Sequence, residues 1–533
     1  MTTFAHRNGQ PLPDSTILSG SPPGTEAAGA SPPVPEPLLD PLLETPGKPA
    51  GDRGDGRDAV IDLTGLTGRA SLERHDRRDS VGNFLDAGAP GTPATLPTPL
   101  PSASPALAGV ATARYDACIL GLGYVGLPTA MSLATSGRRV LGVDVSERRL
   151  DAIRLGDVDV APEDLDDIGN AVQSGALALS SDPAMLAHAD AVIVCVPTPI
   201  DEHAIPDLTM LQGACDLVVA HAHRGQLIIL TSTTYVGTTS DLLIKPLRQR
   251  GFIVGGAGGD VFVAFSPERI DPGNTSYPQH AVPRVVGGAD PESSARAVAV
   301  LHDIAPKLHV VSSAEAAEMT KLYENTFRAV NIAFALEMSQ AAAALDLSIV
   351  EVIDAAATKP YGFMPFYPGP GVGGHCIPCD PHYLLWQLRA QRVEMPLVER
   401  AMNTIISRPR VVATRMRELL ADRGQPIAGA RVLLVGASYK RGIRDTRESP
   451  AIALTQDLID LGAEVLLWDP IAAELDIGDG RRLISGDPRT MGRIDAAVVH
   501  TVHPGLDFGW LEHVPLVLDA TYRLDGLPDR AFV

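Results

Sequence analysis

The sequence contains few cysteines and few aromatic residues, and it has no apolar run of membrane-spanning length. Five cysteines occur among 533 residues, and aromatic residues make up 5%. Cysteines that are scattered and odd in number fit a reducing cytoplasm better than a disulfide framework. The apolar runs, such as 191–196 and 432–435, have only the length of strands. We therefore expect a cytoplasmic protein without membrane insertion, and the N-terminus lacks the apolar core of a secretory signal.

Positive charge is also scarce, since the formal net charge is −20. This balance argues against nucleic acid as a partner, although an acidic protein can hold a local basic pocket. A chain of this length, with 45% hydrophobic residues, can form several domains with cores. Residues 1–113 differ, because proline, glycine, serine, alanine and charged residues dominate there. Such a segment buries too little apolar area to offset its chain entropy, so we expect a disordered extension.

From Tyr115 onward, short apolar runs alternate with helical stretches. We expect strands at 117–120, 139–143, 191–196, 227–230 and 261–265. Strands that alternate with helices indicate a parallel, doubly wound sheet of the α/β class. The first folded domain is therefore predicted over residues 114–313.

A long helix is predicted from Ala314 to about Leu345, because apolar residues recur there at helical spacing with almost no breakers. Such a helix either bridges two lobes and offers apolar surface to a dimer partner, or is an ordinary core helix. We assign residues 314–412 to this central region.

A second strand–helix–strand pattern closes the chain. Strands are expected at 431–435 and 463–468, with a helix at 450–461 between them. Residues 413–533 then form a second α/β domain. The predicted fold has two Rossmann-like, doubly wound lobes joined by a long central helix.

A glycine-rich turn follows the first strand. Its sequence is Gly121-Leu122-Gly123-Tyr124-Val125-Gly126. The first glycine allows a tight turn, the second lets the backbone approach a pyrophosphate, and the third permits close packing of helix and sheet. Asp144 ends the next strand, where a carboxylate binds ribose hydroxyls and repels a 2′-phosphate. The pattern predicts NAD binding rather than NADP binding.

Cys376 lies in a loop with four glycines, at 369, 371, 373 and 374. These glycines suggest a backbone held close to a ligand. A thiol beside a hydride acceptor indicates oxidation beyond the aldehyde, because it can capture an aldehyde and release an acid through a thioester. Cys379 completes a C-x-x-C pair, but the pair does not lie at a βα turn near the start of a small domain, where a redox dithiol is expected. A metal site is not expected, since the chain offers no second C-x-x-C or H-x3-H.

Polar residues accompany this cysteine. Lys321 and Asn325 are four residues apart on the predicted long helix, so they share a face that is either functional or simply solvated. Lys321 is suited to stabilising an oxyanion, and Asp380 to ordering a water. The proline- and aromatic-rich stretch 360–368, which includes Phe366 and Tyr367, offers flat faces to a sugar or base. His375 is either a ligand contact or a packed imidazole.

Together these motifs resemble the UDP-glucose/GDP-mannose dehydrogenase family, over nearly everything from Tyr115 to the C-terminus. The matching blocks are 121–128, 196–199, 231–233, 266–269, 321–325, 373–376 and 439–450. The resemblance implies an N-terminal NAD lobe, a central helix that forms a homodimer, and a C-terminal lobe for the nucleotide sugar. Cys379 is outside the catalytic pattern of the family.

The resemblance also implies roles for individual residues. The catalytic set is Cys376 as nucleophile, Lys321 for the oxyanions, Asn325 for substrate or water, Asp380 and Thr233 for that water, and Glu268 for thioester hydrolysis. The expected NAD contacts are Gly121, Gly123, Tyr124, Val125, Gly126, Asp144, Arg149, Thr198 and Arg447. The expected substrate contacts are Lys440, Phe366, Tyr367, Gly373 and His375.

Within the family, the loop 360–382 looks most like that of UDP-N-acetylglucosamine 6-dehydrogenases, which supply sugar acids for surface polysaccharides. UDP-glucose enzymes usually have Gly-Gly-Ser-Cys where this chain has His375 before the cysteine. UDP-N-acetylmannosamine and UDP-glucose remain alternative substrates. Two other classes remain open: a non-catalytic nucleotide-sugar sensor, and a two-electron alcohol dehydrogenase that leaves Cys376 without a role.

Overall fold

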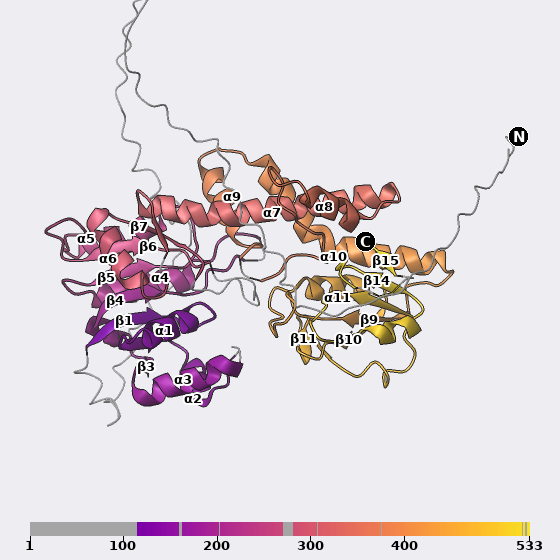
Figure 1. The fold of residues 1–533 in the computed structure, drawn as a ribbon, viewed down its shortest axis with the longest axis horizontal. Coiled ribbons are helices and arrows are strands. Elements are labelled where there is room, and N and C mark those ends of the chain that lie inside the picture. Colours follow the sequence, from indigo (N-terminus) through magenta and orange to yellow (C-terminus); the bar gives the residue numbers. More distant parts are fainter. Residues whose placement is uncertain are drawn as a thin grey trace, which may run out of the picture. The chain divides into compact units, whose positions relative to one another are not determined.

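In this computed structural model, the residues described are 114–158, 162–201, 203–269, 281–305, 307–374, 376–524, 526–527 and 530–533. The predicted disordered extension and His375 lie outside them. The described residues before Pro360 and after Gly362 belong to one unit, which is shown in Figure 1. No described helix is long and apolar enough to cross a membrane.

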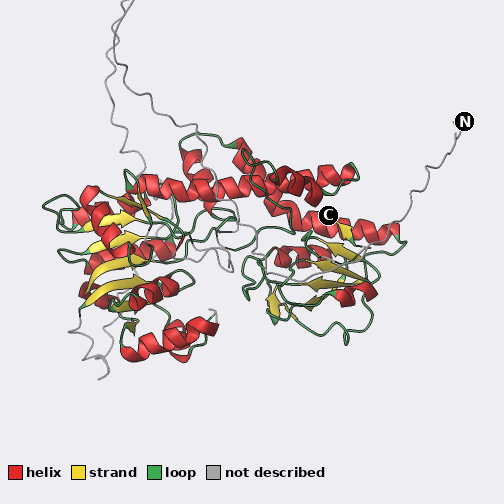
Figure 2. Cartoon of the chain, in the orientation of Figure 1, coloured by secondary structure: helices red, strands yellow, loops and turns green. Residues whose placement is uncertain are grey.

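The N-terminal lobe contains an eight-stranded sheet with the order β3-β2-β1-β4-β5-β6-β7-β8. Figure 2 draws the strands of the protein as yellow arrows. The strands are β1 Tyr115–Leu120, β2 Val140–Val143, β3 Leu177–Ser180, β4 Ala189–Val194, β5 Leu227–Leu230, β6 Phe262–Phe265, β7 Arg284–Gly288 and β8 Leu308–Val310. Strands before β4 are added on one side of β1 and β4 is added on the other, and sheets of this type bind ligands at the carboxyl ends of the strands where the order changes side. The expectation of an all-parallel sheet is wrong at one place, because β6 and β7 pair antiparallel.

Helices cover both faces of this sheet. They are α1 Gly126–Thr135, α2 Glu147–Leu155, α3 Pro162–Ser174, α4 Thr209–His221, α5 Lys245–Gln249 and α6 Pro291–Leu301. Successive residues of β1 enter different cores: Cys118 packs in one hydrophobic cluster and Ile119 in the other. Strands that are buried on both faces read as continuous apolar runs, which is why these strands were predictable.

The central region is helical. Its helices are α7 Ala314–Ala344, α8 Ile349–Ala357, α9 Asp380–Ala390 and α10 Pro396–Asp422. The predicted long helix is α7. A second long helix, α10, was not predicted, and Pro409 lies inside it. Alanines of α7 and Met402 and Ile405 of α10 share one hydrophobic cluster.

The C-terminal lobe has a five-stranded parallel sheet with the order β10-β9-β13-β14-β15. Its strands are β9 Arg431–Val435, β10 Glu464–Trp468, β13 Ala496–Val499, β14 Val517–Asp519 and β15 Ala531–Phe532, with helix α11 Pro450–Asp460 after β9. A separate hairpin is formed by β11 Glu474–Asp476 and β12 Arg482–Ile484. The strand order again changes side between β9 and its neighbour β13, which is where sheets of this type bind ligands.

Candidate active site

The glycine turn between β1 and α1 packs closely against neighbouring backbone of the N-terminal lobe. Gly121 has φ +93°, and a Cβ there would lie 2.6 Å from the carbonyl oxygen of Cys195. A Cβ on Gly126 would lie 1.8 Å from the carbonyl oxygen of Gly121. Only the middle glycine, Gly123, faces open space within the turn. That space fits the close approach of a pyrophosphate to the backbone at the start of α1.

Two of the predicted NAD contacts also shape this turn. Asp144, which follows β2, accepts a hydrogen bond from the Leu122 N–H at 2.8 Å through Oδ2. Its Oδ1 accepts from the Ser146 N–H at 2.9 Å. Arg149 donates from Nε to the Leu122 carbonyl at 2.9 Å. The carboxylate therefore lies beside the turn, and its remaining acceptor capacity is available for ribose hydroxyls.

Replacing Asp144 with alanine should raise the Kd for NAD at least about tenfold, because charge-assisted hydrogen bonds to the turn and the ribose are lost. A fluorescence titration with NAD would measure it. Asp151→Asn is a matched control, because it removes an equal charge from exposed α2, where Asp151 pairs with Arg154. An Asp144 variant that binds NAD as tightly as this control would contradict the assignment.

A buried polar cluster joins α7 to α9. Lys321 and Asn325 of α7 and Asp380 of α9 are buried, with exposed fractions of 9%, 3% and 3%. The Asn325 amide donates a hydrogen bond to Asp380 Oδ2. Burial raises the pKa of Asp380 to about 6, although the charge of Lys321 and the Asn325 bond oppose this shift. The structure therefore brings three of the predicted catalytic residues together in one buried cluster.

Cys376 lies one turn before this cluster. Its carbonyl oxygen accepts from the N–H of Cys379 at 3.2 Å and from that of Asp380 at 2.9 Å. Cys376 is exposed, whereas Cys379 is buried. Burial raises the pKa of the Cys379 thiol to about 12, and the Ile200 N–H donates to this sulfur. Of the two cysteines, Cys376 is therefore the one that a ligand can reach.

Three of the glycines before Cys376 lie close to residues of the C-terminal lobe. A Cβ on Gly371 would lie 2.6 Å from Pro450 Cβ, and one on Gly373 would lie 2.6 Å from Tyr439 Cβ. A Cβ on Gly374 would lie 2.9 Å from the Tyr439 ring. These glycines let the loop pack closely on C-terminal-lobe residues. That they also bring the backbone close to a ligand stays a prediction for these three positions.

Glu268 is buried after β6 in an ion pair with Arg284 of β7. One guanidinium nitrogen of Arg284, Nη1, is buried without a hydrogen-bond partner among the described residues. Thr233 is partly buried in the loop after β5. The sequence predicted the carboxylate but not its cationic partner, because nothing in the local pattern marks a single arginine on a strand.

Glu318 is a further residue that the sequence analysis missed. It is buried on α7 and accepts from the N–H groups of Gly237 and Thr239 and from the Thr239 hydroxyl. Burial raises its pKa to about 7. Glu318 lies four residues before Leu322 and seven before Asn325, so helical spacing puts it on their buried face. This spacing could have predicted from the sequence that Glu318 is buried. Glu318 fixes the end of the loop that begins with Thr231 and contains Thr233.

The aromatic loop residues contact the central helices. Tyr367 donates its hydroxyl hydrogen bond to Asp354 of α8 at 2.7 Å. The Phe366 ring packs edge-on against Phe327 of α7, with centroids 5.9 Å apart. These contacts hold the loop against α7 and α8.

Arg447 of the C-terminal lobe lies near the glycine turn. It forms a bidentate pair with Asp445, at 2.9 and 2.8 Å. Its guanidinium also lies 4.7 Å from the ring centroid of Tyr124. Thr198 shares a hydrogen bond with the buried Tyr383 of α9. Of these two expected NAD contacts, Arg447 thus lies beside the glycine turn and Thr198 is bonded to α9.

Family models match three consecutive parts of the chain. They are described as the NAD binding domain over 115–305, the central domain over 315–404, and the UDP binding domain over 433–526. The chain belongs to the UDP-glucose/GDP-mannose dehydrogenase family. It is an NAD-dependent oxidoreductase of the nucleotide-sugar dehydrogenase type, which confirms the predicted fold, reaction class and cofactor.

Known members of the family support this assignment over most of their length. The chain is 35% identical over 362 residues to the UDP-N-acetyl-D-mannosamine dehydrogenase of Methanocaldococcus jannaschii, covering 67% of this chain and 79% of that one. It is 33% identical over 393 residues to the NDP-N-acetyl-D-galactosaminuronic acid dehydrogenase of Ralstonia solanacearum, covering 72% and 90%. The solved UDP-D-ManNAc dehydrogenase from Pyrococcus horikoshii superposes with a TM-score of 0.70 at 28% identity, covering 78% and 98%.

Proposed function

We propose that the enzyme oxidises C6 of a UDP-N-acetylhexosamine to a carboxylate, with Cys376 as a covalent nucleophile. The observation that carries this proposal is the buried Lys321–Asn325–Asp380 cluster one turn from an exposed cysteine. A two-electron alcohol dehydrogenase needs no such thiol. A nucleotide-sugar sensor needs neither the thiol nor a buried lysine and acid beside it.

The glycine turn, Asp144 and Arg149 would hold NAD, which would supply the hydride acceptor for two successive oxidations at C6. The Cys376 sulfur adds to the aldehyde carbon, and the Lys321 charge stabilises the oxyanion of the thiohemiacetal. After the second oxidation, Asp380 and Thr233 orient the water that attacks the thioester carbon. Glu268, held by Arg284, assists the proton transfer, and cleavage of the carbon–sulfur bond restores the thiol. One water and two NAD are consumed for each carboxylate formed.

UDP-N-acetylglucosamine is our first candidate substrate, with the product used for surface polysaccharide. The loop around Cys376 supports an N-acetylhexosamine over glucose, and the names of both curated relatives support the same class. UDP-N-acetylmannosamine is the second candidate, because it is the substrate in the name of the Methanocaldococcus jannaschii relative. Lys440, Phe366, Tyr367, Gly373 and His375 remain the proposed substrate contacts.

Substrate screening tests this proposal directly. NADH absorbance would be followed with UDP-N-acetylglucosamine, UDP-N-acetylmannosamine, UDP-N-acetylgalactosamine and UDP-glucose, and each product would be weighed by mass spectrometry. Two NADH per sugar and a carboxylate are expected with the first substrate. One NADH per sugar, with an aldehyde as the end product, would contradict the covalent mechanism.

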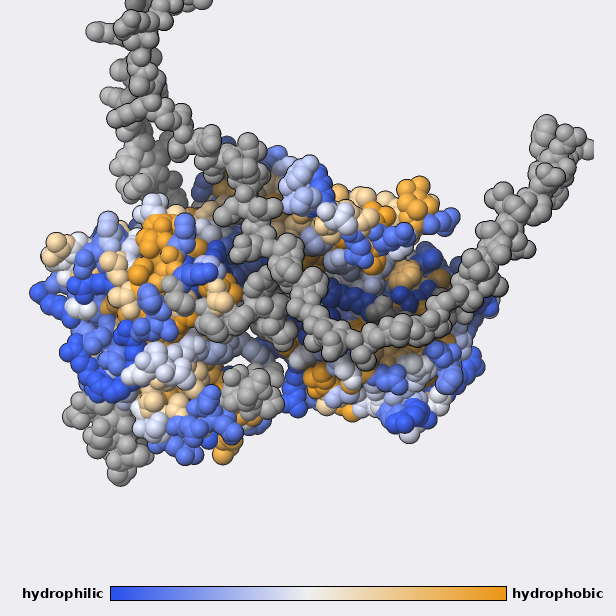
Figure 3. Space-filling model, in the orientation of Figure 1, coloured by the Kyte–Doolittle hydropathy of each residue, from blue (hydrophilic) through white to orange (hydrophobic). Residues whose placement is uncertain are grey.

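We also propose a homodimer through α7. Apolar residues on one face of this helix are exposed: Met319, Tyr323, Phe327, Phe334 and Met338. Figure 3, the hydropathy view, shows hydrophobic residues exposed at several places on the described surface. An apolar stripe of this length on a surface helix is typical of a subunit contact.

Charge introduced into this stripe should dissociate the dimer. Tyr323→Glu combined with Phe334→Glu places two unpaired carboxylates in the proposed interface, and light scattering after gel filtration should then report the monomer mass. Gln340→Glu is the control, because Gln340 is exposed on a different face of α7. A wild-type protein that is already monomeric would refute the proposal.

A further inference from the structure

Asp469 in the C-terminal lobe has the same position relative to its sheet as Asp144 in the N-terminal lobe, but a different role. Asp469 follows β10, the strand next to β9, as Asp144 follows β2 beside β1. In a nucleotide-binding lobe such an acid is expected to meet a ribose. The side chain of Asp469, however, has no exposed surface. It cannot contact a bound nucleotide directly.

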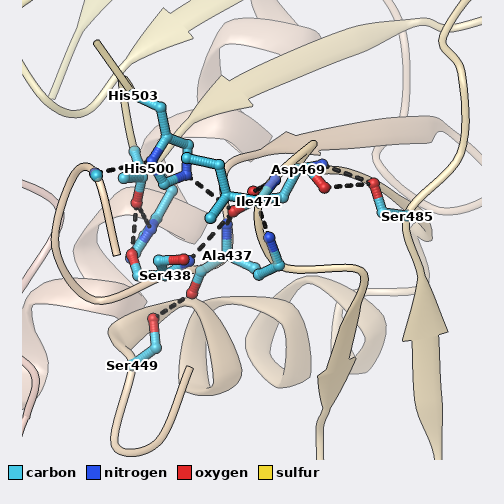
Figure 4. A network of polar contacts seen from close by, with 11 residues as sticks. Ala437, Ser438, Ser449, Asp469, Ile471, Ser485, His500 and His503 are labelled. Atoms are coloured by element: carbon cyan, nitrogen blue, oxygen red, sulfur yellow. Dashed lines mark hydrogen bonds and ion pairs between the residues drawn. The ribbon is translucent and has the colours of Figure 1, made fainter. Parts of the chain in front are cut away.

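Both carboxylate oxygens of Asp469 are used by the chain itself (Figure 4). Oδ1 accepts from the N–H groups of Ile471 at 2.8 Å and Ala472 at 2.9 Å. Oδ2 accepts from the N–H of Ala437 at 2.7 Å and lies 3.1 Å from His503 Nε2. Burial opposes ionisation, but the hydrogen bonds from His503 and the backbone lower the pKa of Asp469 to about 2. The carboxylate is therefore a fixed negative charge.

The hydrogen bonds of His503 define its tautomer. The Gly442 N–H donates to His503 Nδ1 at 3.0 Å, so this nitrogen carries no proton. The ring proton is then on Nε2, where it is donated to Asp469. His503 is buried, so water does not substitute for either partner. The tautomer with its proton on Nε2 can accept from Gly442 and donate to Asp469, so these two partners together favour it.

The same network holds both ends of the segment 437–442. At its start, the Ser449 hydroxyl donates to the Ala437 carbonyl at 2.6 Å, and the Thr501 hydroxyl donates to the Ser438 carbonyl at 2.6 Å. At its end, His503 holds Gly442. Between these anchors lie Tyr439, which packs on the glycines before Cys376, and Lys440, the proposed nucleotide-sugar contact.

We infer that Asp469 and His503 are positioning residues of this dehydrogenase. They fix the segment 437–442, so that Lys440 is placed for substrate binding and Tyr439 for packing against the loop before Cys376. The inference rests on the proposed function, in which Lys440 contacts the nucleotide sugar. Asp469 holds the start of the segment and orients His503, and His503 holds its end. Neither side chain touches the substrate.

The test compares His503→Ala with His503→Asn, and uses Val498→Ala as a stability control. Asparagine can place an amide oxygen where Nδ1 lies and accept from Gly442, whereas alanine cannot. Val498 is buried on β13 in the same lobe and lies in its hydrophobic core. Calorimetric titration with UDP and with NAD would give both dissociation constants, and melting curves would give the stability.

His503→Ala should raise the Kd for UDP at least about tenfold, as expected for one lost buried hydrogen bond and a displaced lysine. The Kd for NAD should change much less. His503→Asn should recover most of the UDP affinity, and Val498→Ala should lower the melting temperature with UDP binding intact. Alanine and asparagine variants that both bind UDP like wild type, while melting earlier, would assign the pair a purely structural role.

Calorimetry with UDP separates this inference from the proposed function. If no UDP-sugar is turned over but His503→Ala loses UDP affinity, the proposed reaction fails and the positioning role stands. If the sugars are turned over and His503→Ala keeps its UDP affinity, the reaction stands and the positioning role fails.

Discussion

Replacing Cys376 with serine should lower the rate of uronate formation by at least about a thousandfold, because the thioester route is closed. Binding of NAD should remain, since the glycine turn and Asp144 belong to other elements of the N-terminal lobe. The substitution should cost little stability, because Cys376 is exposed. Stopped-flow measurement of NADH formation and mass analysis of the product would give the rate and the oxidation state reached.

Cys379→Ser provides the matched control, three residues away in the same turn. Its thiol is buried and lies against the Ile200 N–H rather than at the surface. This variant should retain most of the uronate-forming activity. If the serine variant at position 376 forms uronate as fast as the one at position 379, the covalent mechanism is wrong.

Replacing Asp380 with asparagine should lower kcat at least about a hundredfold, within the range for loss of a positioned acid–base group. The asparagine keeps the size of the side chain and a hydrogen-bond acceptor for Asn325, but it loses the charge that faces Lys321 and the attacking water. An isosteric change limits the loss of packing, so the effect should appear in kcat with the Kd for NAD unchanged.

The pH profile gives a second measure of the same residue. Burial raises the pKa of Asp380 from 3.8 to about 6, so the carboxylate takes up a proton as the pH falls through about 6. The wild-type kcat should therefore decrease below pH 6 and level off above it. Asp380→Asn should lack this limb. A limb that persists in the variant would assign it to another group.

The sequence predicted the fold class and seven of the fifteen described strands, because those strands are apolar runs with clear ends. The runs at 227–230 and 431–435 have the same ends as β5 and β9. The run at 191–196 was placed two residues late, because Cys195 and Val196 are apolar but lie in the loop after β4. The short strands β3, β7 and β8 of the N-terminal lobe and β11 to β15 of the C-terminal lobe were missed, since runs of two to five residues carry little periodicity.

The site was predictable where spacing along one element carries the information. Lys321 and Asn325 on one helix, and Cys376 and Asp380 in one turn, follow from such spacing. Residues whose partners are far along the chain were not predictable: Glu318 binds Gly237 across 81 positions, and His503 binds Gly442 across 61. The glycines before Cys376 correctly indicated that other atoms come close to this backbone. The local sequence could not show that these atoms belong to Tyr439, Glu448 and Pro450.

The loop before Cys376 and the C-terminal lobe cannot change independently, because they touch at Gly371, Gly373 and Gly374. A side chain at Gly373 would meet the carbonyl oxygen of Glu448 at 2.5 Å, and backbone cannot move aside like a flexible side chain. The loop before Cys376 and the segment from Tyr439 to Pro450 must therefore change together. A chimera that takes only its C-terminal lobe from a relative would place residues that do not fit against the loop before Cys376.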